Sequence, residues 1–201
     1  MTFTSAHVTI SLDGFLAGPD QSLDQPMGRG AMPMHRWHFG EMTEVDQRWA
    51  DRLLRPRGAY VMGRNMYGPV RGTWESYGEE WRGWWGDEPP YHAPVFVLTH
   101  HAHEPIEMAG GTTFHFVTDG FDAALAQARE VGDGDVGIAG GASTVRQALA
   151  AGVLDELSLE IAPVLLGEGE RIFDGSVTPT LEVLEAEHSP YATHVRYRVG
   201  R

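Results

Sequence analysis

Short, largely apolar runs recur through the middle of the chain, and glycine or polar turn residues follow each of them. They lie at 59–62, 95–98, 114–117 and 136–139, and helix-like stretches follow the last two. An apolar run of this length is typical of a strand that is buried on both faces, as in a parallel sheet covered by helices. The chain therefore predicts an α/β fold with parallel strands in its centre.

Both ends of the chain predict strands as well. Apolar and polar side chains alternate over 3–12 and again over 157–161, while 181–188 and 195–199 flank a Ser-Pro-Tyr-Ala-Thr turn. Alternation with a period of two indicates a strand, and two such runs around a short turn indicate an antiparallel hairpin. We expect a mixed, mostly parallel sheet with an antiparallel C-terminal edge hairpin.

Three helices are predicted between these strands. One covers 43–54, where Val45, Trp49 and Leu53 recur at helical spacing before Arg-Pro-Arg-Gly ends the pattern. A second begins at Phe121 with Asp119 as its N-cap, and a third runs from the second glycine junction to Ala151.

Length and charge limit the organisation and the partners. The 201 residues fit a single domain, 1–201, and the formal net charge of −13 disfavours nucleic acid and anionic membrane surfaces as partners. The chain has no cysteine and no signal-like N-terminus, so we expect a cytoplasmic protein without disulfides.

Two glycine junctions carry the strongest functional signal. The run at 136–139 leads into Gly140 and Gly141 and then into a helix that opens with Ala142, Ser143 and Thr144. Free N–H groups at a helix N-terminus bind phosphate, and glycine lets a diphosphate approach the backbone. The alternative is a tight turn in which the glycines only supply a positive φ.

The second junction follows the run at 59–62 with Gly63, Arg64 and Asn65. Arg64 would supply the planar cation that an acidic protein needs to hold a phosphate, or else a surface salt bridge. The spacing of the glycines matches neither the Rossmann fingerprint nor a P-loop.

Five segments in order resemble a known family. SLDGFLAG, VMGRNMYG, VFVLTH, VGIAGGASTVRQAL and VLDELSLEIAPVLLGEGERIF are similar to segments of the dihydrofolate reductase-like superfamily, in the branch related to the reductase domain of the bifunctional riboflavin-biosynthesis deaminase-reductase. The resemblance spans about residues 3–199. It implies a three-layer fold with an eight-stranded mixed sheet, an NADPH-dependent reductase and a homodimer.

The resemblance also implies which residues bind the cofactor. It places Gly63, Arg64, Asn65 and Met66 near the adenosine phosphates, and Thr99 and His100 near the 2′-phosphate or adenine. It places Gly140, Gly141, Ala142, Ser143 and Thr144 on the pyrophosphate and nicotinamide side. Leu16 and Ala17 would contact the nicotinamide. Met66 stands where the family commonly has threonine. The Asp-Pro-containing substrate segment of the true riboflavin reductases is not found in the sequence.

Two acids are candidates for catalysis. Dihydrofolate reductases hold their pterin with a carboxylate on the first helix, and Glu44 and Asp46 lie on the corresponding 43–54 segment. The alternative is that both are solvated acids favoured by the helix dipole in the first turn.

Two further groups of residues carry weaker signals. Trp74, Trp81, Trp84 and Trp85 would form either an aromatic wall for a planar ligand or, as we favour, a hydrophobic cover or subunit interface. The histidines within 34–38 and 100–103 lack the spacing of a metal site, so we expect no metal and solvated loop histidines.

Together these observations favour an NADPH-dependent reductase. Its small-molecule substrate would be a planar nitrogen heterocycle or a ribosylamino-pyrimidine, in the class of 5-amino-6-(5-phosphoribosylamino)uracil reductase. Two alternatives stay open: a dihydrofolate reductase, although the usual Pro-Trp pair is missing, and a nucleotide-binding protein without turnover.

Overall fold

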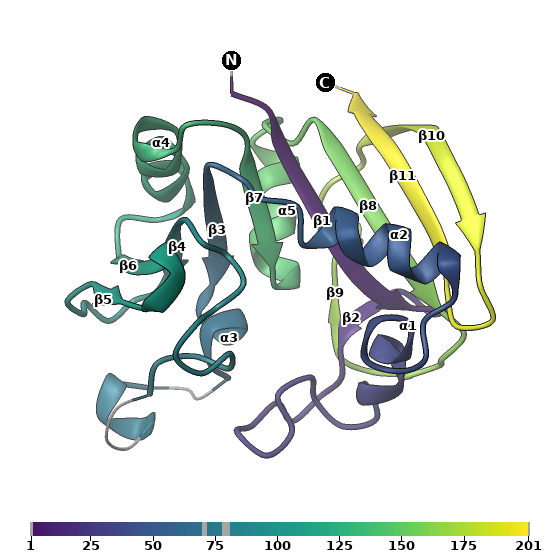
Figure 1. Ribbon diagram of the computed structural model, residues 1–201, viewed down its shortest axis with the longest axis horizontal. Helices are drawn as coiled ribbons and strands as arrows, with labels where there is room; N and C mark the ends of the chain where they lie inside the picture. The colour runs from purple at the N-terminus through teal and green to yellow at the C-terminus, as the bar shows by residue number, and fades with distance from the viewer. Residues whose placement is uncertain (1, 70–71, 78–80, 201) are drawn as a thin grey trace.

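The computed structural model describes residues 2–69, 72–77 and 81–200. Its main sheet has the strand order β10-β11-β8-β1-β7-β3-β4-β6-β5 (Figure 1). The strands are β1 (Thr4–Ser11), β3 (Ala59–Gly63), β4 (Pro94–Leu98), β5 (Ile106–Glu107), β6 (Thr113–Val117), β7 (Val136–Gly140), β8 (Glu156–Ala162), β10 (Thr180–His188) and β11 (Thr193–Gly200). A separate ribbon pairs β2 (Phe15–Ala17) with β9 (Glu170–Arg171).

The sheet is parallel in the centre and antiparallel at both edges. Neighbours from β8 to β6 pair in parallel, whereas β11 pairs antiparallel with β8 and with β10. This confirms the predicted α/β fold and its C-terminal hairpin. Among the described residues the main sheet has nine strands rather than the eight implied by the family resemblance, because short β5 adds an antiparallel edge to β6.

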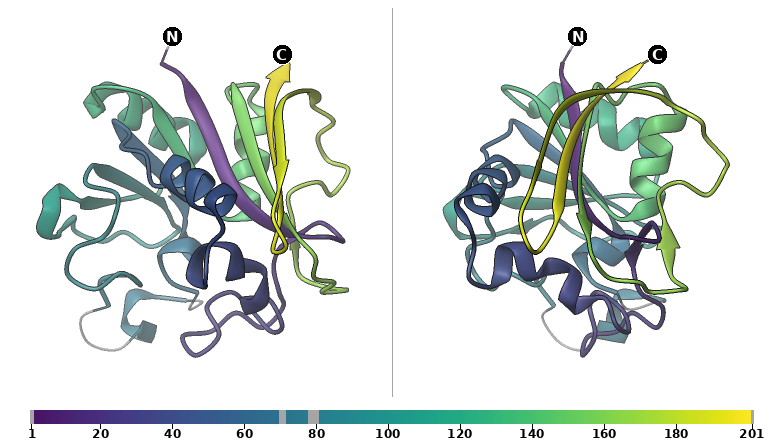
Figure 2. Two further views of the ribbon diagram at one scale, coloured as in Figure 1. Left: turned by 45° about the vertical axis from the view of Figure 1, so that its right-hand side comes forward. Right: turned by 90° about the vertical axis from the view of Figure 1, so that its right-hand side faces the viewer.

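Helices cover both faces of the sheet, which gives the molecule three layers (Figure 2). Helices α4 (Phe121–Val131) and α5 (Ala142–Ala150) pack on one face, where their apolar side chains join Ala6, Val8 and Ile10 of β1 in the main core. The short η1 (Met32–His35), α1 (Arg36–Phe39) and α2 (Glu44–Leu53) cover part of the other face. Single turns α3 (Arg64–Tyr67), η2 (Trp74–Tyr77) and η3 (Ala109–Gly111) complete the structure.

The helix ends explain two boundaries. Thr43 begins α2 with a capping box, in which its hydroxyl accepts from the Asp46 amide while the Asp46 carboxylate accepts from the Thr43 amide. The N-cap of α4 is Gly120 rather than the predicted Asp119: its φ of 88° suits glycine, and no side-chain bond caps the helix. Within the described ranges, no helix is long and apolar enough to cross a membrane.

Strand β1 is buried on both sides, although only one side is apolar. Its polar side chains, Ser5, His7, Thr9 and Ser11, point away from the main core and are all less than 9% exposed. On that side the His7 ring stacks against Trp37 with ring centroids 6.4 Å apart, and Trp37 Nε1 donates to Thr9 Oγ1 at 3.0 Å. The centre of the sheet therefore turns a polar surface towards α1 and α2.

Candidate active site

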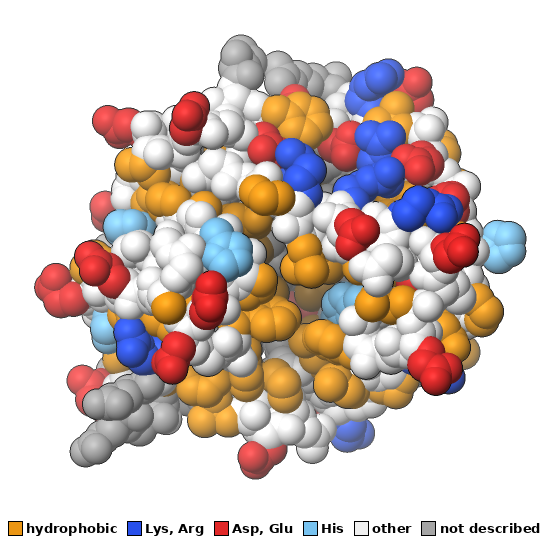
Figure 3. Space-filling view, viewed as in Figure 1, with side chains coloured by type: hydrophobic (Ala, Val, Ile, Leu, Met, Phe, Trp, Pro, Cys, Tyr) orange, Lys and Arg blue, Asp and Glu red, His pale blue; other side chains and the backbone are white. Residues whose placement is uncertain are grey.

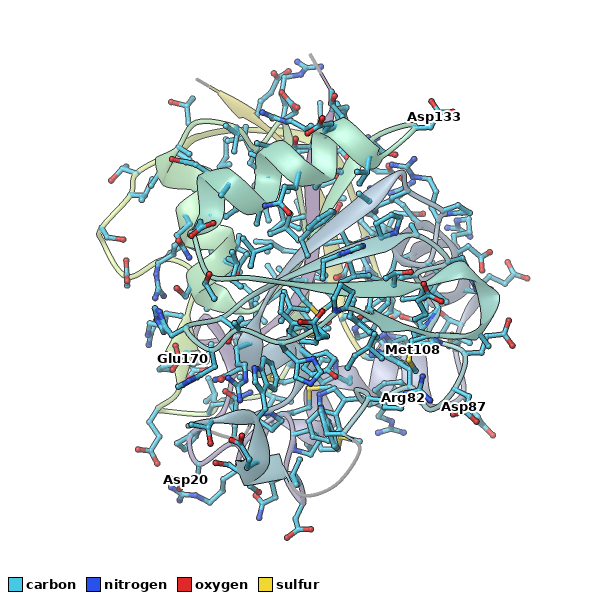
Figure 4. The ribbon with its side chains drawn as sticks, turned by 90° about the vertical axis from the view of Figure 1, so that its left-hand side faces the viewer. Asp20, Arg82, Asp87, Met108, Asp133 and Glu170 are labelled. Carbon is cyan, nitrogen blue, oxygen red and sulfur yellow. The ribbon has the colours of Figure 1, made fainter. Side chains whose placement is uncertain are left out.

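A cleft of about 1130 Å³ runs past the carboxyl ends of the parallel strands and across the polar face of the sheet. Figure 3 shows the hollow near the middle of the molecule, with hydrophobic side chains around it. In open α/β sheets, ligands bind beyond the carboxyl ends of the strands. Glu170 lines the cleft, and Figure 4 shows it towards the same end of the molecule as Asp20. Asp133, in the turn before β7, lies at the opposite end.

The two glycine junctions meet in this cleft. Gly63 is the N-cap of α3 and Gly141 is the N-cap of α5. A Cβ on Gly63 would lie 2.8 Å from Thr144 Oγ1 and 3.6 Å from the Gly141 nitrogen. Because β7 and β3 are adjacent parallel strands, their carboxyl ends bring the two junctions into contact.

The glycines at the second junction have different roles. Gly140 has a φ of 112°, which L side chains rarely adopt, and a cis peptide bond joins it to Gly141. Gly141 has an ordinary φ of −70°, and a Cβ there would meet nothing within 4 Å. Gly140 is therefore required by the backbone, whereas Gly141 leaves open space in front of the N-terminus of α5.

Most residues that the family resemblance implied for the cofactor line this one cleft. They are Leu16, Ala17, Gly63, Arg64, Asn65, Met66, Thr99, His100, Gly141, Ala142, Ser143 and Thr144; Gly140 is the exception. Segments far apart in the sequence are thus assembled along a single edge of the sheet.

Arg64 is held in place beside this edge. Its guanidinium lies 3.7 Å from the centroid of the Trp74 ring, and its Nη1 donates to Thr99 Oγ1 at 3.2 Å. The neighbouring Asn65 donates to Gln21 Oε1 at 3.3 Å, which ties the second junction to the loop after β2. A cation with a fixed planar head is suited to binding a phosphate.

A second set of groups lies on the polar face of the sheet. His7 Nε2 is 2.6 Å from Glu160 Oε1, and the same oxygen is 3.9 Å from His194 Nδ1. His194 Nε2 in turn lies 3.1 Å from Asp46 Oδ1. This His7–Glu160–His194–Asp46 network joins β1, β8, β11 and α2, and its His7 and Glu160 end lines the cleft.

Glu160 is ionised in this network although it is fully buried. Burial raises the pKa of its carboxyl group, but the charge and the 2.6 Å hydrogen bond of His7, together with the nearby His194, outweigh that effect and lower the pKa. A carboxylate only accepts hydrogen bonds, so His7 donates its Nε2 proton to Glu160. His7 Nδ1 is then the ring nitrogen left for a molecule in the cleft.

The predicted catalytic carboxylates do not line the cleft. Glu44 is exposed in the first turn of α2. Asp46 is fully buried and accepts from the Thr43 amide at 2.9 Å and the Thr43 hydroxyl at 2.7 Å. Burial opposes ionisation of Asp46, but hydrogen bonds from Ser189, Thr43 and His194 hold its pKa below the usual value. Asp46 reaches the cleft only through His194, Glu160 and His7.

The sequence did not reveal His7 and Glu160 as site residues. They lie 153 positions apart, so no local motif contains both. One signal was present: His7 interrupts a strand whose neighbours in the sequence, Ala6 and Val8, are apolar, and a polar side chain in a central strand needs a buried partner.

Two more histidines line the cleft, contrary to the expectation of solvated loop histidines. His35 Nδ1 and His38 Nε2 are 3.2 Å apart and their rings stack. Burial lowers the pKa of each to about 4, so both are neutral at neutral pH. Within 100–103, His100 and His103 are exposed, as expected, whereas His101 is half-buried and lines the cleft together with His100. The described part of the chain holds no group of three or more histidine, cysteine, aspartate or glutamate residues that could bind a metal ion.

The tryptophan-rich segment divides between the cleft and a hydrophobic cluster. Trp84 and Trp85 line the cleft. Trp74 and Trp81 pack against the cluster around buried Tyr67, and Trp81 Nε1 donates to the Tyr67 carbonyl at 3.1 Å. The segment is therefore partly a hydrophobic cover and partly a wall of the site.

Comparison with known proteins identifies the family of this domain. The family model of the RibD C-terminal domain matches residues 3–195. No curated protein matches the chain.

Solved structures show the same fold. A Shewanella sp. PV-4 protein assigned to riboflavin biosynthesis superposes with a TM-score of 0.68 at 23% identity, covering 100% of both chains. A pyrimidine reductase-like protein from Corynebacterium diphtheriae has a TM-score of 0.57 at 20% identity, covering 100% of this chain and 92% of its own. A Thermotoga maritima diaminohydroxyphosphoribosylaminopyrimidine deaminase/5-amino-6-(5-phosphoribosylamino)uracil reductase has a TM-score of 0.57 at 17% identity, and the match covers 99% of this chain but 57% of that protein.

Proposed function

The chain belongs to the RibD C-terminal domain family, the reductase domain of RibD, and from this premise we propose that it is an NADPH-dependent reductase. Its substrate is a planar nitrogen heterocycle, and its reaction is of the class catalysed by 5-amino-6-(5-phosphoribosylamino)uracil reductase. The contact between the two glycine junctions is the observation that supports this proposal, because it brings the Arg64 junction next to the N-terminus of α5 in one cleft.

The residues present fit a dinucleotide diphosphate. The open space at Gly141 lies in front of the N-terminus of α5, where N–H groups and the helix dipole favour an anion. Ser143 and Thr144 add hydroxyl donors beside it, and Arg64 supplies the cation at the neighbouring junction. In this assignment Leu16 and Ala17, which line the cleft after β1, contact the nicotinamide.

The reduction needs a hydride and a proton, and we assign the proton to His7. NADPH supplies the hydride when it is bound. His7 lies on the wall of the cleft, and the Glu160 carboxylate accepts from its Nε2 and stabilises the doubly protonated ring. In this form Nδ1 also carries a proton, and that proton passes to the substrate. The ring is then neutral, still donates from Nε2 to Glu160, and regains its Nδ1 proton from water after the product leaves. His194 and Asp46 hold Glu160 from behind and act as positioning residues.

A binding titration tests the cofactor site. We expect NADPH to quench tryptophan fluorescence with a micromolar Kd, more tightly than NADH, and Gly141→Val to weaken binding at least 10-fold by filling the open space. Ala150→Val is the matched control, because Ala150 is exposed at the other end of α5.

Two results would count against the proposal. If the wild-type protein does not bind NADPH, the chain is not an NADPH-dependent reductase. If Gly141→Val binds as tightly as Ala150→Val, the glycine only shapes a turn. Tight binding without NADPH oxidation by 5-amino-6-(5-phosphoribosylamino)uracil or other heterocycles would instead favour a nucleotide-binding protein.

A further inference from the structure

The part of the cleft away from the glycine junctions has an apolar mouth. Several large hydrophobic side chains there are exposed to solvent: Met32 (60%), Phe39 (54%), Met42 (40%), Leu54 (56%) and Trp85 (45%). They come from η1, α1, the loop before α2, the end of α2 and the tryptophan-rich segment, and all five line the cleft. We call these five residues the apolar rim. Exposed hydrophobic side chains that gather in this way mark a binding surface.

The same part of the cleft offers little positive charge. Among its described lining residues Arg57 is the one arginine, its side chain is 6% exposed, and its Nη1 donates to Ser5 Oγ at 2.7 Å and to Asp135 Oδ2 at 3.1 Å. The neighbouring arginines beyond it are likewise ion-paired with acids: Arg52 with Glu185, Arg55 with Asp135, and Arg196 with Glu156 and Glu185.

Negative and neutral groups complete this surface. Glu160 carries a negative charge, and its Oε2 accepts no hydrogen bond from the residues that the structure describes. His35 and His38 are neutral at neutral pH. A phosphate placed here would lose its hydration, and the nearby cationic groups, His7 and Arg57, are already paired with Glu160 and Asp135.

We propose that the substrate is a nitrogen heterocycle that carries an apolar group and no phosphate. This inference rests on the proposed function and names the substrate class of the same cleft. The heterocycle lies against His7, and its apolar group is buried by the apolar rim, which removes hydrophobic surface of both from water. The reductase of this chain thus differs in substrate from an enzyme that binds a phosphoribosyl group.

Two compounds that share the uracil ring and differ in the substituent on one nitrogen, 1-benzyluracil and uridine 5′-monophosphate, test the proposal. In 1-benzyluracil an apolar group stands on the nitrogen that carries the phosphoribosyl group in uridine 5′-monophosphate. We expect calorimetric titration of the full chain, with and without NADP⁺, to show that 1-benzyluracil binds at least about 10-fold more tightly than uridine 5′-monophosphate. The reason is that the apolar rim buries the benzyl group, whereas no unpaired cation among the described residues of this part of the cleft compensates the charge of the phosphate.

A rim variant tests the surface itself. Met42→Lys should weaken 1-benzyluracil about 5- to 10-fold and strengthen uridine 5′-monophosphate, because it replaces an apolar contact by a cation. Leu165→Lys is the matched control, because it changes the net charge by the same amount at a position that is 72% exposed and does not line the cleft. Both positions are exposed, so neither change disturbs the core.

Three results would overturn the proposal: tighter binding of the phosphate compound by the wild-type protein, no binding of 1-benzyluracil, or equal effects of the two lysine variants. Sedimentation of the same proteins adds a fourth. If Met42→Lys dissociates a dimer and leaves 1-benzyluracil binding unchanged, the rim is covered by a second copy of the chain. NADPH titration of the same samples keeps the outcomes separate, because failure to bind NADPH refutes the reductase while the comparison of uracil ligands still stands.

Discussion

Replacing Gly63 by alanine tests the contact between the two glycine junctions. The φ of Gly63 is −78°, which suits any residue, so the backbone itself does not oppose the change. The new Cβ would lie 2.8 Å from Thr144 Oγ1, closer than van der Waals contact allows. Thr144 is 2% exposed within α5, so its side chain has no space into which to move. Overpacking of this kind costs about 1–3 kcal/mol, and we expect Gly63→Ala to lower the free energy of unfolding by that amount.

A double-mutant cycle isolates the cause. Thr144→Ala removes the clashing oxygen, and the next atom in line, the Gly141 nitrogen, is 3.6 Å from the new Cβ, an ordinary contact. In the Thr144→Ala background, Gly63→Ala should therefore be neutral, or stabilising by about 0.4–1 kcal/mol, because alanine restricts the unfolded chain. The expected coupling between the two substitutions is therefore about 1–4 kcal/mol.

Urea unfolding followed by tryptophan fluorescence gives the four free energies of unfolding. Equal m-values across the four proteins would show that the denatured state is unchanged. If the two substitutions are additive within about 0.5 kcal/mol, the junctions do not touch as the structure describes, and the proposed cofactor site loses its main support.

Three further predictions concern the polar face of the sheet. His35 and His38 have a pKa of about 4 in the folded protein but near 6.5 in the unfolded chain, so the unfolded state binds more protons as the pH falls. The free energy of unfolding should therefore decrease between about pH 6.5 and 4, on the order of 3 kcal/mol for each histidine. Urea unfolding at several pH values should show a smaller decrease for His38→Gln, and the same dependence on pH as the wild type would contradict the assignment. Asp46→Ala should lower the free energy of unfolding by about 2–4 kcal/mol, because it removes a capping box and leaves buried donors without an acceptor. Glu44→Ala should change the free energy of unfolding by less than about 0.5 kcal/mol in the same assay. His7→Gln should reduce the rate of NADPH oxidation about 10²- to 10⁴-fold with NADPH affinity unchanged, and equal loss of both would show a structural role only.

Local patterns in the sequence were sufficient to predict several of the helices and strands that line the cleft. The apolar run into Gly140 and the spacing of Val45, Trp49 and Leu53 depend on neighbours within one element, and β7, α5 and α2 form where they predict. The extra edge strand β5 was missed because two residues, Ile106 and Glu107, are too short to show any alternation.

The acid–base groups could not be assigned in the same way. Glu44 and Asp46 were chosen because they lie on the first helix, yet a helix has several faces, and the capping box turns Asp46 inward towards Thr43 and His194. Its partner His194 is 148 positions away, so the orientation depends on how α2 packs on β11 and not on the sequence of α2.

A more general signal was available in β1. The alternation over 3–12 correctly predicted a strand, and alternation usually means that the polar side meets solvent. Here β1 pairs with β7 on one side and β8 on the other, so it lies inside a nine-stranded sheet, and helices or the cleft cover both of its faces. The polar side chains of a strand in that position, His7 among them, must be paired with buried groups or with a ligand. A histidine on a central strand of a predicted mixed sheet is for this reason a better candidate for a site residue than an acid in the first turn of a helix, because the helix dipole favours an acid there whether or not it lies in a site.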